Sequence, residues 1–306
     1  MPTNSVVLIT GTSTGFGRAA AETLARRGYI VYASMRHSTG LNAPNRQALE
    51  SLASREKLAL QVTDLDVSDD VSVEDAVREI LADAGRIDVV INNAGTPVLG
   101  LIEACSIDLF RKVLDVNLFG AARVNRAVLP SMRHQRSGLL VHVSSVAGRV
   151  GAPSLGVYCA SKFALEALAD AYRFELSPFG IDSVLVEPGF HKTPAFEKLV
   201  GPDDQARVAD YGPAADYAAR VRALFDAVGA SPETPSVDEI VDVFVRLIET
   251  PIGARPFRTV SQSMQALLEA YNAAAEALRP AVATMLTVPE LTVLQPATTE
   301  GERAKV

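Results

Sequence analysis

The sequence predicts an α/β fold: a doubly wound parallel sheet in a single domain with a C-terminal helical extension. Short, almost wholly apolar runs alternate with longer amphipathic segments up to about residue 190. Apolar strands separated by helices pair in parallel, because helices then cover both faces of the sheet. Hydrophobic residues make up 48% of the 306-residue chain, which is enough to bury a large core.

Seven apolar runs are the expected strands. They cover residues 6–10, 29–33, 58–63, 87–91, 138–143, 181–186 and 257–260. Crossovers between parallel strands of one sheet are right-handed. Ligands of such sheets bind outside the carboxyl ends of the strands, so the residues that follow each strand are the first candidates for a site.

Six helices are expected between and after these strands, over residues 18–27, 72–84, 107–134, 157–176, 236–249 and 261–278. Apolar residues between 73 and 81 recur at spacings of three and four, which places them on one helical face. Gly28 suits the residue that follows a helix C-terminus. Ser236 with Glu239 three residues later predicts a capping box.

Composition and charge exclude several classes of function. The 29 basic and 36 acidic residues give a net charge of −7, which argues against nucleic acid as the main partner. Cys105 and Cys159 form no C-x-x-C pair, and the four histidines are too dispersed for a helical ligand pair, so no metal is expected. No apolar run reaches the length of a membrane span, and a cytoplasmic location is expected by default.

A glycine-rich turn joins the first expected strand to the first helix. It reads Thr10-Gly11-Thr12-Ser13-Thr14-Gly15-Phe16-Gly17. Glycines let the backbone approach a pyrophosphate, and the N–H groups and dipole at the helix start attract its charge. The turn therefore predicts dinucleotide binding by Gly11, Thr12, Ser13, Gly15, Phe16 and Gly17 in a Rossmann-type fold.

The same turn also matches a nucleophile elbow, with Ser13 as the nucleophile of a serine hydrolase. That alternative requires an acid and then a histidine downstream, for which His191 is the formal candidate. An elbow normally follows a strand in the middle of the sheet, whereas this turn follows the first strand.

The tip of the second strand distinguishes between the two nicotinamide dinucleotides. It reads Ala33-Ser34-Met35-Arg36-His37, and the first carboxylate after it is Glu50. An NAD binder would present a carboxylate here to the ribose 2′-hydroxyl, whereas an arginine pairs with the 2′-phosphate of NADP. Arg36 therefore predicts NADP(H) as the cofactor.

Jointly, the residues that follow the strands resemble the short-chain dehydrogenase/reductase family over about residues 5–193. The resemblance is carried by Thr10-Gly11, Gly15, Gly17, Asp66, Asn92-Asn93-Ala94-Gly95, Asn117, Ser145, Tyr158, Lys162, Pro188-Gly189 and Thr193. The Ser34-Met35-Arg36 tip and the length beyond the usual core are similar to the hydroxysteroid, retinol and carbonyl reductase branch.

The resemblance implies roles for residues at several strand ends. Asp66 and the Val67 backbone would contact the adenine, and Asn93, Ala94 and Gly95 would leave room for the adenosine half. Pro188, Gly189 and Thr193 would lie beside the nicotinamide. Asn117 would kink its helix and hold a water that relays protons to Lys162, which would also bind the nicotinamide ribose. Residues 107–133 and 157–176 would join copies into a homodimer or homotetramer.

Tyr158 and Lys162 are four residues apart, one turn along the same face of a helix. A nearby ammonium and an oxidised nicotinamide both favour the phenolate, which makes Tyr158 the expected proton donor or acceptor. Ser145 ends the fifth strand, where its hydroxyl donates to a substrate oxygen during hydride transfer. Its neighbour Ser144 is the alternative, and the family spacing favours Ser145.

Residues 1–260 are expected to form the Rossmann-type catalytic domain, with a variable substrate lid at about residues 190–235. Five prolines interrupt an Ala-rich, partly helical stretch there, at positions 194, 202, 213, 232 and 235. Residues 261–306 form the C-terminal helical extension and a frayed tail. Phe190, Phe196, Leu199, Tyr211, Leu99 and Leu155 are candidates for an apolar pocket wall.

The sequence therefore predicts an NADP(H)-dependent oxidoreductase that transfers a hydride between nicotinamide and a carbonyl or secondary alcohol of a bulky apolar substrate. Asn117, Ser145, Tyr158 and Lys162 are its expected catalytic residues. A second hypothesis is a dinucleotide-binding sensor or scaffold without turnover. The presence of Ser145, Tyr158 and Lys162 together argues against that hypothesis.

Overall fold

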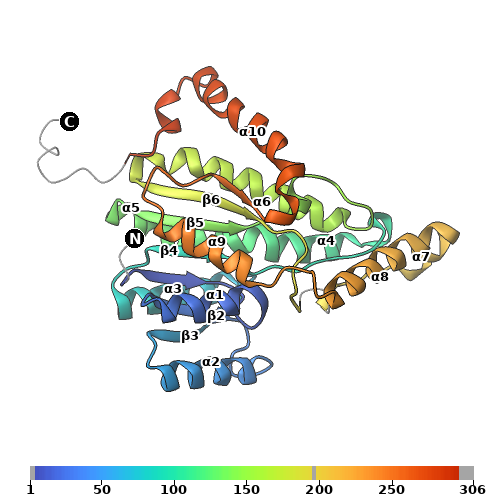
Figure 1. Cartoon of the computed structure of the whole chain (residues 1–306), viewed down its shortest axis with the longest axis horizontal. Coiled ribbons are helices and arrows are strands. Elements are labelled where there is room, and N and C mark those ends of the chain that lie inside the picture. Colours follow the sequence, from blue (N-terminus) through green and yellow to red (C-terminus); the bar gives the residue numbers. More distant parts are fainter. Residues whose placement is uncertain (1–3, 195–197, 296–306) are drawn as a thin grey trace, which may run out of the picture.

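Seven parallel strands form one sheet in the order β3-β2-β1-β4-β5-β6-β7 (Figure 1). The computed structural model describes residues 4–194 and 198–295. The strands are β1 (Val6–Ile9), β2 (Ile30–Met35), β3 (Leu60–Asp64), β4 (Val89–Asn92), β5 (Gly138–Val143), β6 (Ile181–Glu187) and β7 (Arg258–Val260). Every neighbouring pair is parallel, which confirms the predicted doubly wound sheet.

Helices cover both faces of this sheet (Figure 1). They are α1 (Gly15–Arg26), α2 (Ala43–Glu56), α3 (Asp70–Ala84), α4 (Ile107–Leu114), α5 (Gly120–Gln135), α6 (Gly156–Glu175), α7 (Gln205–Asp210), α8 (Asp216–Ala230), α9 (Asp238–Glu249) and α10 (Gln262–Met285). Successive side chains of a strand point to opposite faces. Val7 and Ile9 of β1 accordingly join a core with α1, α2 and α9, whereas Val6 and Leu8 join a core with α3 and α5.

The strand order reverses between β1 and β4, because the chain runs outward from β1 to β3 and then returns to the other side of β1. The ends of the two strands are joined there. The backbone N–H of Thr10 donates to Ile91 O at 3.0 Å, and Asn93 Nδ2 donates to Thr10 O at 2.8 Å. A reversal of this kind opens a crevice at the carboxyl ends of the strands.

Three predicted helices differ in the structure. The long helix expected over residues 107–134 is divided into α4 and α5 by a π-helical turn, Asp115–Phe119. α10 continues through Pro280 to Met285, beyond its expected end. α9 begins at Asp238 with Val237 as N-cap, and the Glu239 carboxylate lies 3.1 Å from His191 Nε2. The predicted Ser236–Glu239 capping box is therefore wrong.

The sequence missed α2 and predicted the end of α1 correctly. α2 was not expected at all, and only Leu49, Leu52 and Ala53 of its residues are buried. α1 ends where predicted, since Arg27 caps it and Gly28 follows with a φ of +88°. No helix among residues 4–194 and 198–295 has the length and apolarity needed to cross a bilayer.

The segment after β6 is held to the loop after β4. Val98 and Val200 form an isolated parallel bridge, and Arg207 of α7 pairs with Glu103 at 2.8 Å. α7 and α8 project from this side of the molecule (right in Figure 1). The C-terminal extension lies along the β7 edge of the sheet, where α10 contacts β7. Beyond α10, the backbone N–H of Gln295 donates to Ser177 O at 2.9 Å. The predicted tail beyond residue 295 lies outside the described residues.

Candidate functional site

A cavity of about 680 Å³ opens at the carboxyl ends of the strands. It is continuous from the glycine-rich turn after β1 to the first turn of α6 and the segment after β6. Sixteen of the expected catalytic and cofactor-binding residues line it: Gly11, Ser13, Gly15, Phe16, Arg36, Asp66, Val67, Asn93, Ala94, Gly95, Ser145, Tyr158, Lys162, Pro188, Gly189 and Thr193. The strand ends therefore bring the expected site residues to one place.

Close packing in the glycine-rich turn requires glycine at two positions. Gly11 has a φ of +71°, and a Cβ there would lie 2.9 Å from Ala94 Cα. A Cβ on Gly17 would lie 2.5 Å from Asn93 Nδ2. Thr12 is fully buried, and its hydroxyl donates to Ser34 O at 3.0 Å. Thr12 and Gly17 thus shape the turn from behind, and the structure places neither on the cavity wall.

The N-terminus of α1 faces this cavity through Thr14, Gly15 and Phe16. The first turn of α1 carries no acidic residue, so its dipole favours an anion. Lys198, which the sequence did not single out, donates from Nζ to Thr14 Oγ1 at 3.1 Å. This lysine, from the segment after β6, adds a positive charge to the part of the cavity next to the α1 N-terminus.

Arg36 follows β2 and lines the cavity, as do Asp66 and Asn42. Its backbone carbonyl accepts a hydrogen bond from Asn42 Nδ2 at 2.8 Å, and its side chain is exposed. Burial alone would raise the pKa of Asp66. Hydrogen bonds from Ser68 and the charges of Arg36 and His37 outweigh burial and lower this pKa. The Asp66 carboxylate is therefore ionised beside the Arg36 guanidinium.

Tyr158 and Lys162 both reach the cavity from α6. Lys162 Nζ lies 5.7 Å from the centroid of the Tyr158 ring and donates to Val143 O at 2.8 Å. Lys162 is 4% exposed. A Cβ on Gly95 would lie 3.7 Å from Nζ, so the glycine leaves the ammonium accessible from the cavity.

Burial affects the pKa values of both Tyr158 and Lys162. It raises the pKa of the phenol to about 12, even though the Ser145 hydroxyl lowers it. Burial also lowers the pKa of Lys162 to about 8, against the negative charge of Glu166. The expected stabilisation of the phenolate by Lys162 together with an oxidised nicotinamide stays a prediction. The phenol is held in its proton-donating form.

The two serines at the end of β5 differ in their contacts. Both line the cavity, but Ser144 Oγ donates to the buried Glu166 Oε1 at 2.7 Å. Ser145 Oγ accepts a hydrogen bond from the backbone N–H of Ala147 at 3.1 Å, and its interaction with Tyr158 affects the phenol pKa. The structure therefore favours Ser145 over Ser144 as the hydroxyl that faces a substrate oxygen.

Asn117 lies in the π-helical turn between α4 and α5 and is 1% exposed. Its Oδ1 accepts from the backbone N–H of Thr96 at 2.7 Å, and its Nδ2 donates to Thr96 O at 3.1 Å and to Ser161 Oγ at 2.9 Å. A π-helical turn often marks a functional position in a helix. Asn117 does not line the cavity, and it joins the loop after β4 to α6.

His191 lies at the root of the segment after β6 and lines the cavity. Its Nε2 faces Glu239 Oε2 at 3.1 Å, and its Nδ1 faces Gly189 O at 3.2 Å. Both ring nitrogens are therefore engaged by groups other than Ser13. Glu239 also follows His191 in the chain, the reverse of the order that an elbow hydrolase needs. This geometry does not favour the hydrolase hypothesis.

The remaining wall of the cavity is largely apolar. Leu155, Phe190 and Leu199 line it as expected, and Phe225 and Met264 join them without having been singled out. The rings of Phe190 and Phe225 are 5.1 Å apart. Of the other candidates, Leu99 and Tyr211 lie outside this lining, and Phe196 lies outside the described residues.

A doubly wound sheet with a glycine-rich turn and a Ser–Tyr–Lys cluster in one crevice defines a class of α/β protein whose cavity lies at the carboxyl ends of the strands. The model of the short chain dehydrogenase family matches residues 5–203. The chain belongs to this family, which consists of oxidoreductases that bind a nicotinamide dinucleotide.

Several relatives are a little over one third identical to this chain over the residues that align. Human 17-beta-hydroxysteroid dehydrogenase type 1 is 37% identical over 256 residues, which are 81% of this chain and 75% of the relative. Retinol dehydrogenase 8 from Bos taurus is 37% identical over 263 residues, 82% of this chain and 78% of the relative. The 3-ketodihydrosphingosine reductase of Bacteroides thetaiotaomicron is 37% identical over 61% of this chain, and the match spans 64% of that relative's length, less than two thirds.

Solved structures share the fold over most of the chain. A short-chain dehydrogenase from Streptomyces avermitilis superposes with a TM-score of 0.74 at 27% identity, covering 93% of this chain and 97% of the other. An alcohol dehydrogenase from Thermococcus sibiricus, complexed with 5-hydroxy-NADP, gives a TM-score of 0.67 at 25% identity over 84% of this chain and 95% of the other.

Proposed function

We propose that this chain is an NADP(H)-dependent oxidoreductase that transfers a hydride between nicotinamide and a carbonyl or secondary alcohol. One observation carries the proposal: the Ser145, Tyr158 and Lys162 side chains reach the same cavity as the glycine-rich turn. Nicotinamide supplies the hydride chemistry when it is bound. The protein binds and orients the two reactants and supplies the proton.

Tyr158 is the proposed proton donor in the reducing direction. Burial raises the pKa of its phenol to about 12, so the group carries its proton at neutral pH. Loss of this proton leaves a phenolate, which the adjacent Lys162 ammonium stabilises. The Ser145 hydroxyl donates to the same substrate oxygen as negative charge develops there. In the oxidising direction the same groups act in reverse.

The turn around Gly11 fits the pyrophosphate of a dinucleotide. A Cβ at Gly11 would meet Ala94, so the backbone is bare where a phosphate approaches, and the α1 N-terminus lies alongside it. Gly11, Ser13, Gly15 and Phe16 are the proposed contacts, with Thr12 and Gly17 holding the turn in shape. Lys198 adds a charge-assisted contact to the same group.

The Arg36 end of the cavity supports NADP(H) rather than NAD(H). The guanidinium is exposed and lines the cavity where the second strand ends, and an arginine binds a phosphate monoester well. Asp66 and Val67 lie beside it as the proposed adenine contacts. Among related structures, one is complexed with 5-hydroxy-NADP and another, from Burkholderia phymatum, with NAD. Proteins of this fold hold either nucleotide, so the proposed preference for NADP(H) rests on Arg36.

Asn93, Ala94 and Gly95 are the proposed cofactor contacts along the adenosine half, and Pro188, Gly189 and Thr193 are those beside the nicotinamide. Asn117 is proposed to support Lys162 through the loop that it holds at Thr96. The apolar wall of Leu155, Phe190 and Leu199 favours a bulky apolar substrate. We further propose residues 1–260 as the catalytic domain and 261–306 as an extension, a cytoplasmic location, and a homodimer or homotetramer.

The test is NADPH consumption with a panel of aldehydes and ketones that range from small to bulky and apolar. We expect turnover, with catalytic efficiency that increases with the apolar surface of the carbonyl compound. Saturable NADPH binding without turnover of any carbonyl would instead identify a dinucleotide sensor. Binding would be followed by the fluorescence of the reduced nicotinamide.

A further inference from the structure

Glu166 lies on the same helical face as the two catalytic residues of α6. Tyr158, Lys162 and Glu166 follow one another at intervals of four residues, so each is one turn beyond the last. Glu166 is 2% exposed and does not line the cavity. Its carboxylate is a buried negative charge directly behind the proposed reaction centre.

The Glu166 carboxylate holds the end of β5 in place. Its Oε1 accepts the hydroxyl of Ser144 at 2.7 Å, and Ser144 immediately precedes Ser145. Its Oε2 accepts from Arg149 at 3.2 Å and contacts Arg258 of β7. A Cβ on Gly148 would lie 2.4 Å from Glu166 Oε1. The turn after Ser145 is therefore packed directly onto this carboxylate.

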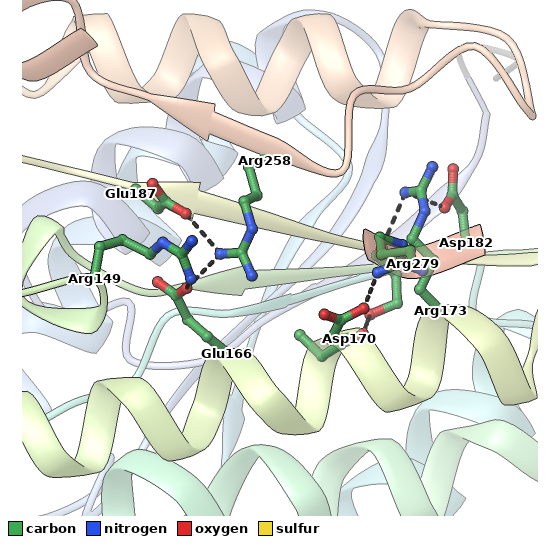
Figure 2. A network of polar contacts seen from close by, with 10 residues as sticks. Arg149, Glu166, Asp170, Arg173, Asp182, Glu187, Arg258 and Arg279 are labelled. Carbon is green, nitrogen blue, oxygen red and sulfur yellow. Dashed lines mark hydrogen bonds and ion pairs between the residues drawn. The ribbon is translucent and has the colours of Figure 1, made fainter. Parts of the chain in front are cut away.

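Arg258 and Arg149 connect this cluster to the end of β6 and to the C-terminal helix (Figure 2). Arg258 also binds Glu187 at 2.8 Å, the residue that precedes Pro188. Asn272 of α10 donates to Glu187 Oε2 at 2.9 Å, and its Oδ1 accepts from Arg149 Nε at 2.8 Å. The C-terminal extension thus contributes a side chain to a network that touches both strand ends of the site.

The network contains two carboxylates and two guanidiniums, and each of these side chains is at most 8% exposed. Removing so many charges from water is costly, and buried ion clusters are often no more stabilising than apolar packing. Stability alone is therefore a weak reason for this cluster. Its position, one turn behind Lys162 and in contact with Ser144, indicates a role in the reaction.

We propose that Glu166 is a positioning residue for the reaction, which orients Ser145 through Ser144 and sets the charge of Lys162, and that α10 completes this arrangement through Asn272. The inference rests on the proposed function for its catalytic consequence. Glu166 does not touch the cavity, so it acts through Ser144 and Lys162 and not on a substrate directly.

The charges around Lys162 support this role. Burial lowers the pKa of Lys162 to about 8, and the Glu166 carboxylate opposes this change. The other titratable groups facing it are Tyr158 on α6 and His142 on β5, whose pKa burial and the Lys162 charge lower to about 3. Burial and the charge of Glu187 raise the pKa of Glu166 overall, although Arg258 and Ser144 oppose this rise. The ionised Glu166 carboxylate favours the charged form of Lys162.

Glu166→Gln tests the charge while keeping the size of the side chain and an oxygen acceptor for Ser144. Asp170→Asn is the matched control, because Asp170 lies one further turn along the same face of α6 and pairs with Arg279 of α10 instead (Figure 2). We expect loss of the Glu166 charge to lower the pKa of Lys162, since a charge of opposite sign no longer opposes burial. The basic limb of the kcat/KM profile in carbonyl reduction then moves to lower pH.

The Lys162 titration is also followed without any substrate, by nitrogen NMR of the full-length, lysine-labelled protein with the resonance assigned through Lys162→Arg. We expect E166Q to move both the titration and the basic limb, and D170N to move neither. Coincident titrations of E166Q and the wild type would overturn the proposal. A wild type that titrates as described but reduces no carbonyl overturns the proposed function and leaves the electrostatic assignment standing.

Two milder variants keep the proposal testable if E166Q does not fold. Ser144→Ala removes the hydrogen bond from Ser144 to Glu166 and keeps the Glu166 charge. We therefore expect kcat to fall about tenfold with no change in the basic limb. Asn272→Ala removes the contribution of α10, and we expect a smaller loss in kcat with an unchanged Kd for NADPH. Wild-type kcat in both variants would contradict the positioning role.

Discussion

Ser144 and Ser145 are neighbours in the chain, yet their hydroxyls have different partners: Ser144 donates to the buried Glu166 at 2.7 Å, while Ser145 interacts with Tyr158. One hydroxyl therefore belongs to the scaffold and the other to the site.

This division predicts different effects for two otherwise identical substitutions. Ser145→Ala is expected to lower kcat by about two orders of magnitude, the scale of a lost donor to a developing oxyanion, with little effect on thermal stability. Ser144→Ala is expected to lower the free energy of unfolding by about 1–3 kcal/mol, because it leaves a buried carboxylate oxygen unpaired. Steady-state kinetics and chemical denaturation measure the two effects. Equal losses of kcat would show that the assignment of the two hydroxyls is wrong.

Arg36→Asp tests the proposed cofactor preference. The substitution replaces a phosphate-binding cation with an anion, so the Kd for NADPH is expected to rise far more than the Kd for NADH. Arg46→Asp is the control, because Arg46 pairs with Glu50 on exposed α2 and lies outside the cavity lining. Fluorescence titration with both nucleotides gives the result. An equal loss for NADPH and NADH in R36D would contradict the role of Arg36.

A pH effect on stability follows from His142, which is fully buried. Neither of its ring nitrogens has a hydrogen-bond partner among the described residues, and burial, with the Lys162 charge, lowers its pKa from 6.5 to about 3. The folded state therefore keeps a neutral ring while the unfolded state gains a proton. Stability is lost as the pH falls from 6.5 towards 3, by up to about 5 kcal/mol.

His142→Leu removes this titration and keeps an apolar side chain of similar size. We expect its free energy of unfolding to decline less between pH 6.5 and pH 4 than that of the wild type, as measured by urea denaturation. His134→Leu is the control, since His134 is exposed on α5 and is expected to leave the acid dependence nearly unchanged. Parallel pH profiles for H142L and the wild type would contradict the assignment.

Much of this fold and site followed from local sequence patterns. Most strands are largely apolar runs, and the residues after them meet at one edge because the strands are parallel. Tyr158 and Lys162 share a helical face by spacing alone. Ser145, Asn93 and Gly189 reach the same cavity for the same reason.

Other features depend on contacts between distant residues, which local patterns do not encode. α2 buries only three residues, so its periodicity is too weak to identify it. The ion pairs of Arg258 with Glu166 and Glu187 join residues that are 92 and 71 positions apart. The reach of Lys198 to Thr14 spans 184 positions. The rise in the pKa of Tyr158 depends on burial, which the helix spacing does not reveal.

The measurement that tests the central claim most directly is single-turnover oxidation of bound NADPH by a carbonyl substrate, in the wild type and in Tyr158→Phe. Tyr172→Phe is the control, because Tyr172 lies on the same helix and stacks on His142 away from the cavity. If Tyr158 supplies the proton, Y158F slows this step by at least about two orders of magnitude with an unchanged Kd for NADPH, and Y172F reacts at the wild-type rate. A Y158F protein that transfers hydride at the wild-type rate would contradict the account.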